Sequence, residues 1–149
     1  MKIRECMCQD VCFVKPDCKV YDAARIMNEN HIGCIPVCND QKNVVGVLTD
    51  RDIVLRTVAC DKDVKTTPVS EIMTTKVCTC QSEENIEQAQ NTMAKFQIRR
   101  LPVLDMQNKM VGILSLGDLA HNTEEIGTQN VSETVENICN CKGNIKNYC

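Results

Sequence analysis

Two stretches of nine residues decide the fold: residues 45–53 read VGVLTDRDI, and residues 111–119 read VGILSLGDL. The second stretch begins 66 residues after the first, and the match extends outward until residues 3–54 align with residues 69–120 without a gap. Aliphatic residues exchange for aliphatic residues along this alignment. Self-similarity at a fixed spacing is typical of a duplicated structural unit. The chain therefore contains two copies of one unit.

Each copy has the pattern of a strand, a helix, two strands and a second helix. Apolar residues at i, i+3 and i+7 predict the first helix, and short apolar runs joined by turn residues predict the strands. Thr49 and Ser115 are placed to open the second helix. The expected strands are residues 11–14, 34–38 and 44–48 in the first copy and 77–80, 100–104 and 110–114 in the second, and the first helices carry Val20, Ala23, Ala24 and Met27, or Ile86, Ala89 and Met93.

The predicted fold class is α+β, with two β-α-β-β-α repeats packed about an approximate twofold axis, because one such unit cannot bury its sheet alone. The expected organisation is a first repeat at residues 3–58, a linker at 59–68, a second repeat at 69–121 and a tail at 122–149. In the tail, Val131, Val135 and Ile138 predict one amphipathic helix that covers an apolar edge or a partner subunit, with Gly143 beyond its end.

Composition excludes several classes of function. Among 149 residues, 17 basic and 20 acidic side chains give a net charge of −3, and aromatic residues are 3% with no tryptophan. Neither the charge nor the scarcity of stacking side chains suits a nucleic-acid binder. No apolar run approaches the ~18 residues of a membrane span, and the N-terminus lacks the apolar stretch of a signal peptide. We therefore expect a cytoplasmic protein without nucleic-acid or membrane partners.

The order, spacing and duplication of these motifs resemble the cystathionine-β-synthase (CBS) domain, from residue 3 to about residue 121. The resemblance rests on IGCIPV at residues 32–37 with residues 44–53, and on IRRLPV at residues 98–103 with residues 112–119. It implies a tandem pair that binds an adenosine-containing ligand (AMP, ADP, ATP or S-adenosylmethionine) between its two units. It also implies a non-catalytic, regulatory role without a required cofactor, a homodimer, and a regulated protein that the sequence does not identify.

Thr49 with Asp52, and Ser115 with Asp118, have two interpretations. A hydroxyl followed three residues later by an acid is a helix-capping arrangement. The same helix start also offers backbone N–H groups to an anion, while the carboxylate can accept hydrogen bonds from a ribose. The resemblance places ribose on Asp52 and Asp118, and phosphate on Thr49 and Ser115.

The other candidate ligand contacts surround the two Pro-Val motifs. Arg99 and Arg100 precede Leu101-Pro102, and arginine suits phosphate, whereas the first copy has Gly33-Cys34 at these positions. We therefore expect the site built on Asp118 to be the better phosphate site, unless Arg51 compensates. Ile35-Pro36 and Leu101-Pro102, with backbone groups of Cys34 and Arg100, are the expected slot for adenine.

Neither His31 nor His121 has a nucleophile at a meaningful spacing, so no catalytic residue is predicted. The twelve cysteines include no Cys-x-x-Cys pair. Cys6, Cys38 and Cys80 stand where the other repeat has an aliphatic residue, which indicates reduced, structural thiols and no metal site. Two alternatives stay open. One is a redox or metal module centred on Cys139, Cys141 and Cys149. The other is a ligand-free adaptor for proteins, which Arg99 folded onto Asp52 or Asp118 would favour.

Overall fold

Two β-sheets form the centre of the molecule, and the computed structural model describes them within residues 1–140. The first sheet pairs two antiparallel strands, β1 (Cys34–Cys38) and β2 (Val44–Thr49). The second sheet contains β3 (Cys80–Gln81), β4 (Arg100–Leu104) and β5 (Met110–Ser115), with β3 parallel to β4 and β4 antiparallel to β5. The four hairpin strands appear within one residue of their predicted bounds.

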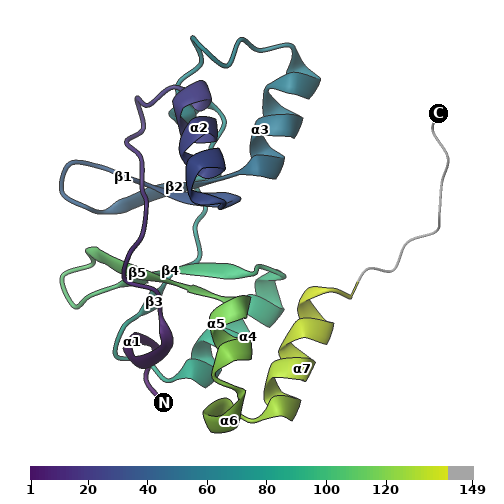
Figure 1. The fold of residues 1–149 in the computed structure, drawn as a ribbon. Coiled ribbons are helices and arrows are strands. Elements are labelled where there is room, and N and C mark those ends of the chain that lie inside the picture. The colour runs from purple at the N-terminus through teal and green to yellow at the C-terminus, as the bar shows by residue number, and fades with distance from the viewer. Residues whose placement is uncertain (141–149) are drawn as a thin grey trace, which may run out of the picture.

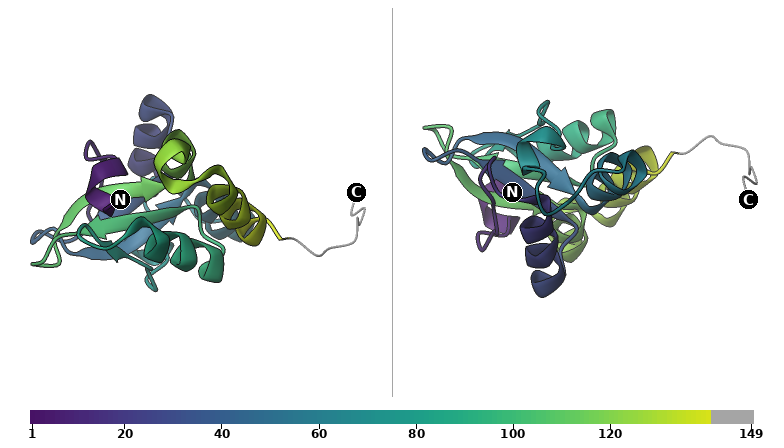
Figure 2. Two further views of the ribbon diagram at one scale, coloured as in Figure 1. Left: turned by 90° about the horizontal axis from the view of Figure 1, so that it is seen from below. Right: turned by 90° about the horizontal axis from the view of Figure 1, so that it is seen from above.

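Helices cover the outer face of each sheet, so the molecule has four layers (Figures 1 and 2). The helices are α1 (Ile3–Cys6), α2 (Val20–Asn30), α3 (Asp50–Arg56), α4 (Ile86–Phe96), α5 (Leu116–His121), α6 (Thr123–Ile126) and α7 (Thr128–Ile138), with short 3-10 turns η1 (Val58–Cys60) and η2 (Val69–Glu71). The α+β class with two repeats and a C-terminal helix is confirmed. None of the helices in residues 1–140 is long and apolar enough to cross a bilayer.

The two repeats exchange their N-terminal segments. Ile3, at the start of the first repeat, is buried in the core of the second, while Val69 and Ile72 are buried in the core of the first. Each exchanged segment then crosses between the sheets. The first crosses from Cys8, which pairs with Ile113 of β5, to a single bridge between Val14 and Val37.

This crossing corrects the prediction for the first strand of each repeat. Of residues 11–14 only Val14 makes a sheet bridge, and of residues 77–80 only Cys80 belongs to a strand. A segment that pairs with one sheet at its start and with the other at its end has no room for a continuous ladder between them. The same holds for the second crossing, where Thr74 pairs with Val47 before the chain reaches β3.

Glycine is required where an exchanged segment meets the opposite hairpin. A Cβ atom built on Gly46 would lie 2.4 Å from the sulfur of Met73, and one on Gly112 would lie 2.7 Å from the sulfur of Met7. These distances are far below van der Waals contact. The two glycines of the repeated motif thus allow methionine side chains of the exchanged segments to pack on the hairpins.

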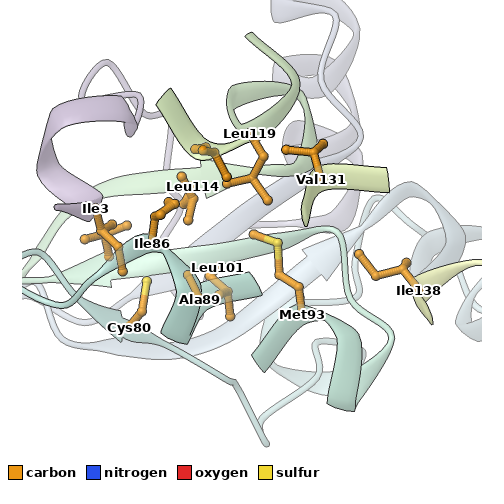
Figure 3. Close-up of a cluster of buried hydrophobic side chains, with 12 residues drawn as sticks. Ile3, Cys80, Ile86, Ala89, Met93, Leu101, Leu114, Leu119, Val131 and Ile138 are labelled. Carbon is orange, nitrogen blue, oxygen red and sulfur yellow. The ribbon is translucent and has the colours of Figure 1, made fainter. Parts of the chain in front are cut away.

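Two hydrophobic cores lie between the sheets and their helices. Figure 3 shows the second core, where Leu101, Leu114 and Leu119 meet the C-terminal helix. Val131 and Ile138 of α7 are buried, as the spacing predicts, and Val135 is half-buried. Gly143 lies outside the described residues. The segment predicted as a linker runs beside α2, where the carbonyl groups of Val64 and Thr67 accept hydrogen bonds from Tyr21 and Val20.

Candidate functional site

A pocket of about 200 Å³ lies between the two sheets. Pro36 and Val47 are paired across β1 and β2, and Pro102 and Ile113 are paired across β4 and β5. All four line the pocket and make its walls largely apolar. The complete lining is Cys34, Pro36, Val47, Thr49, Asp52, Thr74, Lys76, Val77, Cys78, Ile98, Arg100, Pro102 and Ile113.

Alternation along the strands decides which predicted residues reach this pocket. Successive side chains of a strand point to opposite faces, so Pro36 and Pro102 face the space between the sheets. Ile35 and Leu101 face the helices and are 0% exposed. Of the residues in the expected adenine slot, Ile35 and Leu101 do not line this pocket, because their side chains belong to the hydrophobic cores.

Asp52 and Thr49 form one polar corner of the pocket. The backbone N–H of Thr49 donates to Oδ2 of Asp52 at 3.0 Å, and the N–H of Asp52 donates to Oγ1 of Thr49 at 3.1 Å. This is the reciprocal capping box that starts α3. The capping interpretation is therefore confirmed, and the cap holds the Asp52 carboxylate at the pocket; binding of a ligand by Asp52 stays a prediction.

Ser115 and Asp118 form the corresponding cap of α5 but do not line this pocket. Oδ2 of Asp118 accepts hydrogen bonds from the backbone N–H of Ser115 at 2.7 Å and from its hydroxyl at 2.6 Å. The Ser115 hydroxyl proton is therefore used within the cap. The two Ser/Thr-x-x-Asp motifs, equivalent in sequence, differ in their environment.

Two cations face the pocket from the second repeat. Arg100 lies at the start of β4, and Lys76 lies in the second crossing segment. Among the described residues, neither has an acidic partner within ion-pair distance. Two unpaired positive charges beside an apolar cavity favour an anionic ligand.

This placement corrects the expected pairing of charge and carboxylate. Arg100 shares its pocket with Thr49 and Asp52, and not with Ser115 and Asp118. The repeats face each other, so a side chain at the start of β4 points across the interface toward the other repeat. Arg99 and Arg51 are exposed and do not line the pocket.

The second crossing segment supplies the contacts that the sequence did not predict. Thr74, Lys76, Val77 and Cys78 line one side of the pocket. The bridge between Thr74 and Val47 holds this segment against β2. In the sequence, the one feature that points to this segment is the alignment of the repeats. It matches residues 74–78 with residues 8–12, which occupy the equivalent place around the pseudo-twofold axis.

A second pocket, of about 250 Å³, occupies that equivalent place. Its lining includes Cys8, Asp10, Val11, Cys12, Ile32, Cys34 and Ile113. Asp10 stands where Lys76 stands in the first pocket, and Cys8 stands where Thr74 stands. Arg100 reaches both pockets, but the second one has an acid in place of a base. The two pockets therefore have unlike electrostatics.

The described cysteines are all free thiols. Burial raises the pKa of Cys80 to about 12 and, together with the nearby Asp118 carboxylate, that of Cys6 to about 11. Burial also raises the pKa of Cys34, which the neighbouring Arg100 opposes. These thiols stay protonated near neutral pH, as small apolar side chains do.

The two alternative interpretations gain no support from residues 1–140. No group of three or more His, Cys, Asp or Glu side chains in that range could hold a metal ion. Cys139 is exposed, while Cys141 and Cys149 lie outside the described residues. Asp52 has Arg56 as its ion-pair partner, at 3.6 Å, in place of the Arg99 contact that an adaptor would favour.

Comparisons with known proteins agree with this architecture. Relatives include the CBS domain-containing protein YhcV of Bacillus subtilis (strain 168), 40% identical over 136 residues that cover 91% of this chain and 94% of the relative. The structure of Hypoxic Response Protein I with two coordinated zinc ions gives a TM-score of 0.75 at 31% identity, covering 81% of this chain and 98% of that one.

The structure of CBSX2 in complex with AMP gives a TM-score of 0.73 at 27% identity, covering 84% of this chain and 97% of that one. The family model of the CBS domain matches twice, over residues 3–58 and residues 69–125. These two matches, the relative and the shared fold lead to one assignment: the chain belongs to the CBS domain family and contains two CBS domains in tandem.

Proposed function

We propose that this CBS pair is a regulatory module that binds one adenine nucleotide in the pocket beside Asp52. The observation that carries the proposal is the composition of this pocket. It combines apolar walls, a carboxylate held by a helix cap, and two cations without acidic partners among the described residues. CBSX2, which shares the fold, is described in complex with AMP.

The ribose is assigned to Asp52. Oδ2 accepts the backbone N–H of Thr49, and within residues 1–140 Oδ1 has only the long 3.6 Å contact with Arg56. An ionised carboxylate has about four acceptor sites, so it can also accept hydrogen bonds from ribose hydroxyl groups. The side chain is 14% exposed, which makes such charge-assisted bonds stronger than they are in water.

The phosphate is assigned to the other side of the pocket. Arg100 and Lys76 supply charge there, and arginine can bind a phosphate with two parallel hydrogen bonds. Thr49 adds a hydroxyl donor, because Oγ1 accepts from Asp52 and its own proton has no acceptor within residues 1–140. These groups favour AMP, ADP or ATP over an adenosine compound without phosphate.

The adenine is assigned to the apolar walls formed by Val47, Pro102 and Ile113, with Ile98 beside them. Pockets for small molecules combine such apolar surface with a few polar groups that fix orientation. Aliphatic and proline side chains can contact both faces of a flat base. The scarcity of aromatic residues is therefore compatible with binding.

Calorimetry on the full chain under reducing conditions tests this proposal. AMP, ADP and ATP are compared with adenosine and S-adenosylmethionine. We expect the phosphorylated ligands to bind and Asp52→Asn to weaken them by about tenfold or more, through loss of charge-assisted hydrogen bonds. Asparagine can still accept the Thr49 N–H, so the α3 cap remains.

Asp118→Asn is the matched control, because it changes the equivalent cap outside the pocket. It is expected to leave the affinity within a factor of about two. Arg100→Met keeps an apolar stem and should weaken AMP more than adenosine. Absence of nucleotide binding by the wild-type chain would refute the proposal. Equal losses in Asp52→Asn and Asp118→Asn would refute the assignment of the site.

A further inference from the structure

Three cysteines border the second pocket. Cys8 and Cys12 lie on the first crossing segment, and Cys34 begins β1. Cys8 is exposed, while Cys12 and Cys34 are half-buried. Among residues 1–140, no three or more His, Cys, Asp or Glu side chains are placed to hold a metal ion together. The chemistry left to neighbouring thiols is oxidation to a disulfide.

The path of the first crossing segment brings Cys12 close to Cys34. The backbone N–H of Val14 donates to the carbonyl oxygen of Pro36 at 3.1 Å, and Val14 forms a parallel bridge with Val37 (Figure 1). Neighbouring strands lie about 4.8 Å apart, and a disulfide needs Cα atoms about 4.4–6.8 Å apart. Cys12 and Cys34 lie two and three residues before this bridge and border one pocket, so their spacing suits a disulfide.

The other thiols that border the two pockets lie on the opposite sheet. Cys8 bridges to β5. Cys78 lies two residues before Cys80, which pairs with β4. Stacked sheets lie about 10 Å apart, which is more than the distance that a disulfide spans. Neither Cys8 nor Cys78 can therefore reach Cys34 without movement of the backbone.

The pair occurs in the first repeat only. Cys78 occupies the place of Cys12 in the second repeat, but Arg100 occupies the place of Cys34. Burial raises the pKa of Cys34, which makes this thiol the poorer target for an oxidant. Arg100 opposes the effect of burial and borders the same pocket, so its charge favours the Cys34 thiolate when that sulfur attacks a partner.

We propose that Cys12 and Cys34 are a reversible redox pair, which a hydroperoxide oxidises to a disulfide that joins the first crossing segment to β1. The hydroperoxide transfers one oxygen atom to the Cys12 sulfur, which becomes a sulfenic acid, and is itself reduced to water or an alcohol. The Cys34 sulfur then attacks the Cys12 sulfur and forms the S–S bond. The displaced hydroxide leaves as water with the proton of Cys34. A dithiol reductant restores both thiols, and the cysteines of the tail take no part.

Peptide mass spectrometry of the full chain tests the pair. The reduced chain is freed of reductant under nitrogen, treated with hydrogen peroxide and alkylated at its remaining thiols. We expect a disulfide between Cys12 and Cys34, identified by fragmentation of the linked peptides and lost on treatment with dithiothreitol. Cys12→Ser should lower the yield of any disulfide at Cys34 by about tenfold or more, because no other described thiol near the pockets is within reach. Cys34→Ala, which removes the other partner, should abolish the same product.

Cys78→Ser is the matched control, because Cys78 is the equivalent of Cys12 in the second repeat. Cys8→Ser is a second control, since it removes the other thiol that the first crossing segment places at the second pocket. Both variants should leave the yield of the disulfide unchanged. Thermal unfolding shows that each variant is folded. A main product that links Cys34 to Cys8 or Cys78 would overturn the proposal, as would a wild-type chain in which Cys12 and Cys34 stay reduced.

One consequence rests on the proposed function. Cys34 borders both pockets, so a bond to Cys12 draws its side chain toward the second pocket and away from the wall of the first. The affinity of the oxidised chain for AMP, measured by calorimetry, should fall by about threefold or more and recover on reduction. The Cys12→Ser chain, treated with peroxide in the same way, should show no such fall.

The two proposals fail in different ways. A reduced wild-type chain that does not bind AMP would refute the proposed function, while the mass spectrum still decides whether the redox pair exists. An affinity for AMP that the disulfide leaves unchanged would overturn the coupling between the pair and the nucleotide pocket.

Discussion

The guanidinium of Arg56 donates a hydrogen bond of 2.7 Å to the carbonyl oxygen of Ile72, joining the last turn of α3 to the segment exchanged from the second repeat. The same group lies 3.3 Å from Oγ1 of Thr74 and 3.6 Å from Oδ1 of Asp52. Thr74 and Asp52 both line the candidate pocket. Arg56 is therefore a positioning residue for two walls of that pocket.

Arg56→Met is expected to weaken nucleotide binding and to lower the free energy of unfolding by about 1 kcal/mol, since the half-exposed group makes one short charged hydrogen bond. Calorimetry and chemical denaturation measure the two effects. Arg56→Lys keeps the charge and should recover part of the affinity. If Arg56→Met lowers stability while the affinity stays at the wild-type value, Arg56 has no positioning role.

Gly46→Ala is expected to destabilise the chain by about 1–3 kcal/mol, the usual cost of overpacking. The added Cβ would lie 2.4 Å from the Met73 sulfur. Denaturation midpoints measure the change, and Met73→Ala in the same chain should recover part of it by removing the clash. Gly117→Ala is the control, because its Cβ would meet only Ser115 Oγ, at 3.4 Å. Equal effects of Gly46→Ala and Gly117→Ala would contradict this account.

Nucleotide binding is expected to saturate at one molecule per chain. Asp10 occupies the place of Lys76 in the second pocket, where its charge repels phosphate. The molar ratio in calorimetry measures this number directly. Lys76→Asp should abolish the difference between the pockets and weaken binding, whereas Lys95→Asp, on the exposed surface of α4, should not. Two sites of equal affinity in the wild-type chain would show that the difference between Asp10 and Lys76 has no influence on binding.

The buried thiols predict a loss of stability at alkaline pH. A raised pKa in the folded state means that Cys80, at about 12, keeps its proton after the unfolded chain has lost it near the ordinary value of 9.0. Stability from this group is complete below pH 9 and declines as the pH rises from 9 toward 12. Cys6, with a folded-state pKa of about 11, adds to the decline in the same direction.

Cys80→Val removes one titrating group and places there the residue that the first repeat has, Val14. The variant should fold with near-wild-type stability at pH 7 and lose less stability between pH 9 and 11, measured by urea denaturation. Exposed Cys60 provides the control, since Cys60→Ser should leave this pH dependence unchanged. A pH profile unaffected by Cys80→Val would contradict the assignment.

The sequence predicts the fold well where a pattern is local or repeated. The hairpin strands follow from apolar runs such as residues 100–104, and α7 follows from the spacing of Val131, Val135 and Ile138. The exchange of Ile3 and Ile72 between the cores leaves no local signal, because both residues are simply apolar. The crossing segments were for this reason predicted as longer strands than the chain forms.

The candidate site was predicted in part. Thr49, Asp52, Pro36 and Pro102, which the sequence singles out, line the pocket together with Cys34 and Arg100, and their role in binding a ligand stays a prediction. The association of Arg100 with Asp52 depends on how the two repeats face each other, which no single repeat encodes. Lys76 was not predicted because its role depends on the path of the exchanged segment. The motif thus predicts the helix caps, while the packing of the repeats determines which cap faces a cavity.

The exchanged segments also determine how the molecule unfolds. A break between the repeats would leave each half without a piece of its own interior, with Ile3 on one fragment and the leucines it packs against on the other. Neither half is a self-sufficient folding unit, so heat or denaturant should melt both in a single cooperative step. Ligand binding in one pocket can then affect the other repeat directly through the hydrophobic cores, because each core contains residues from both repeats. Such coupling needs no hinge between the repeats.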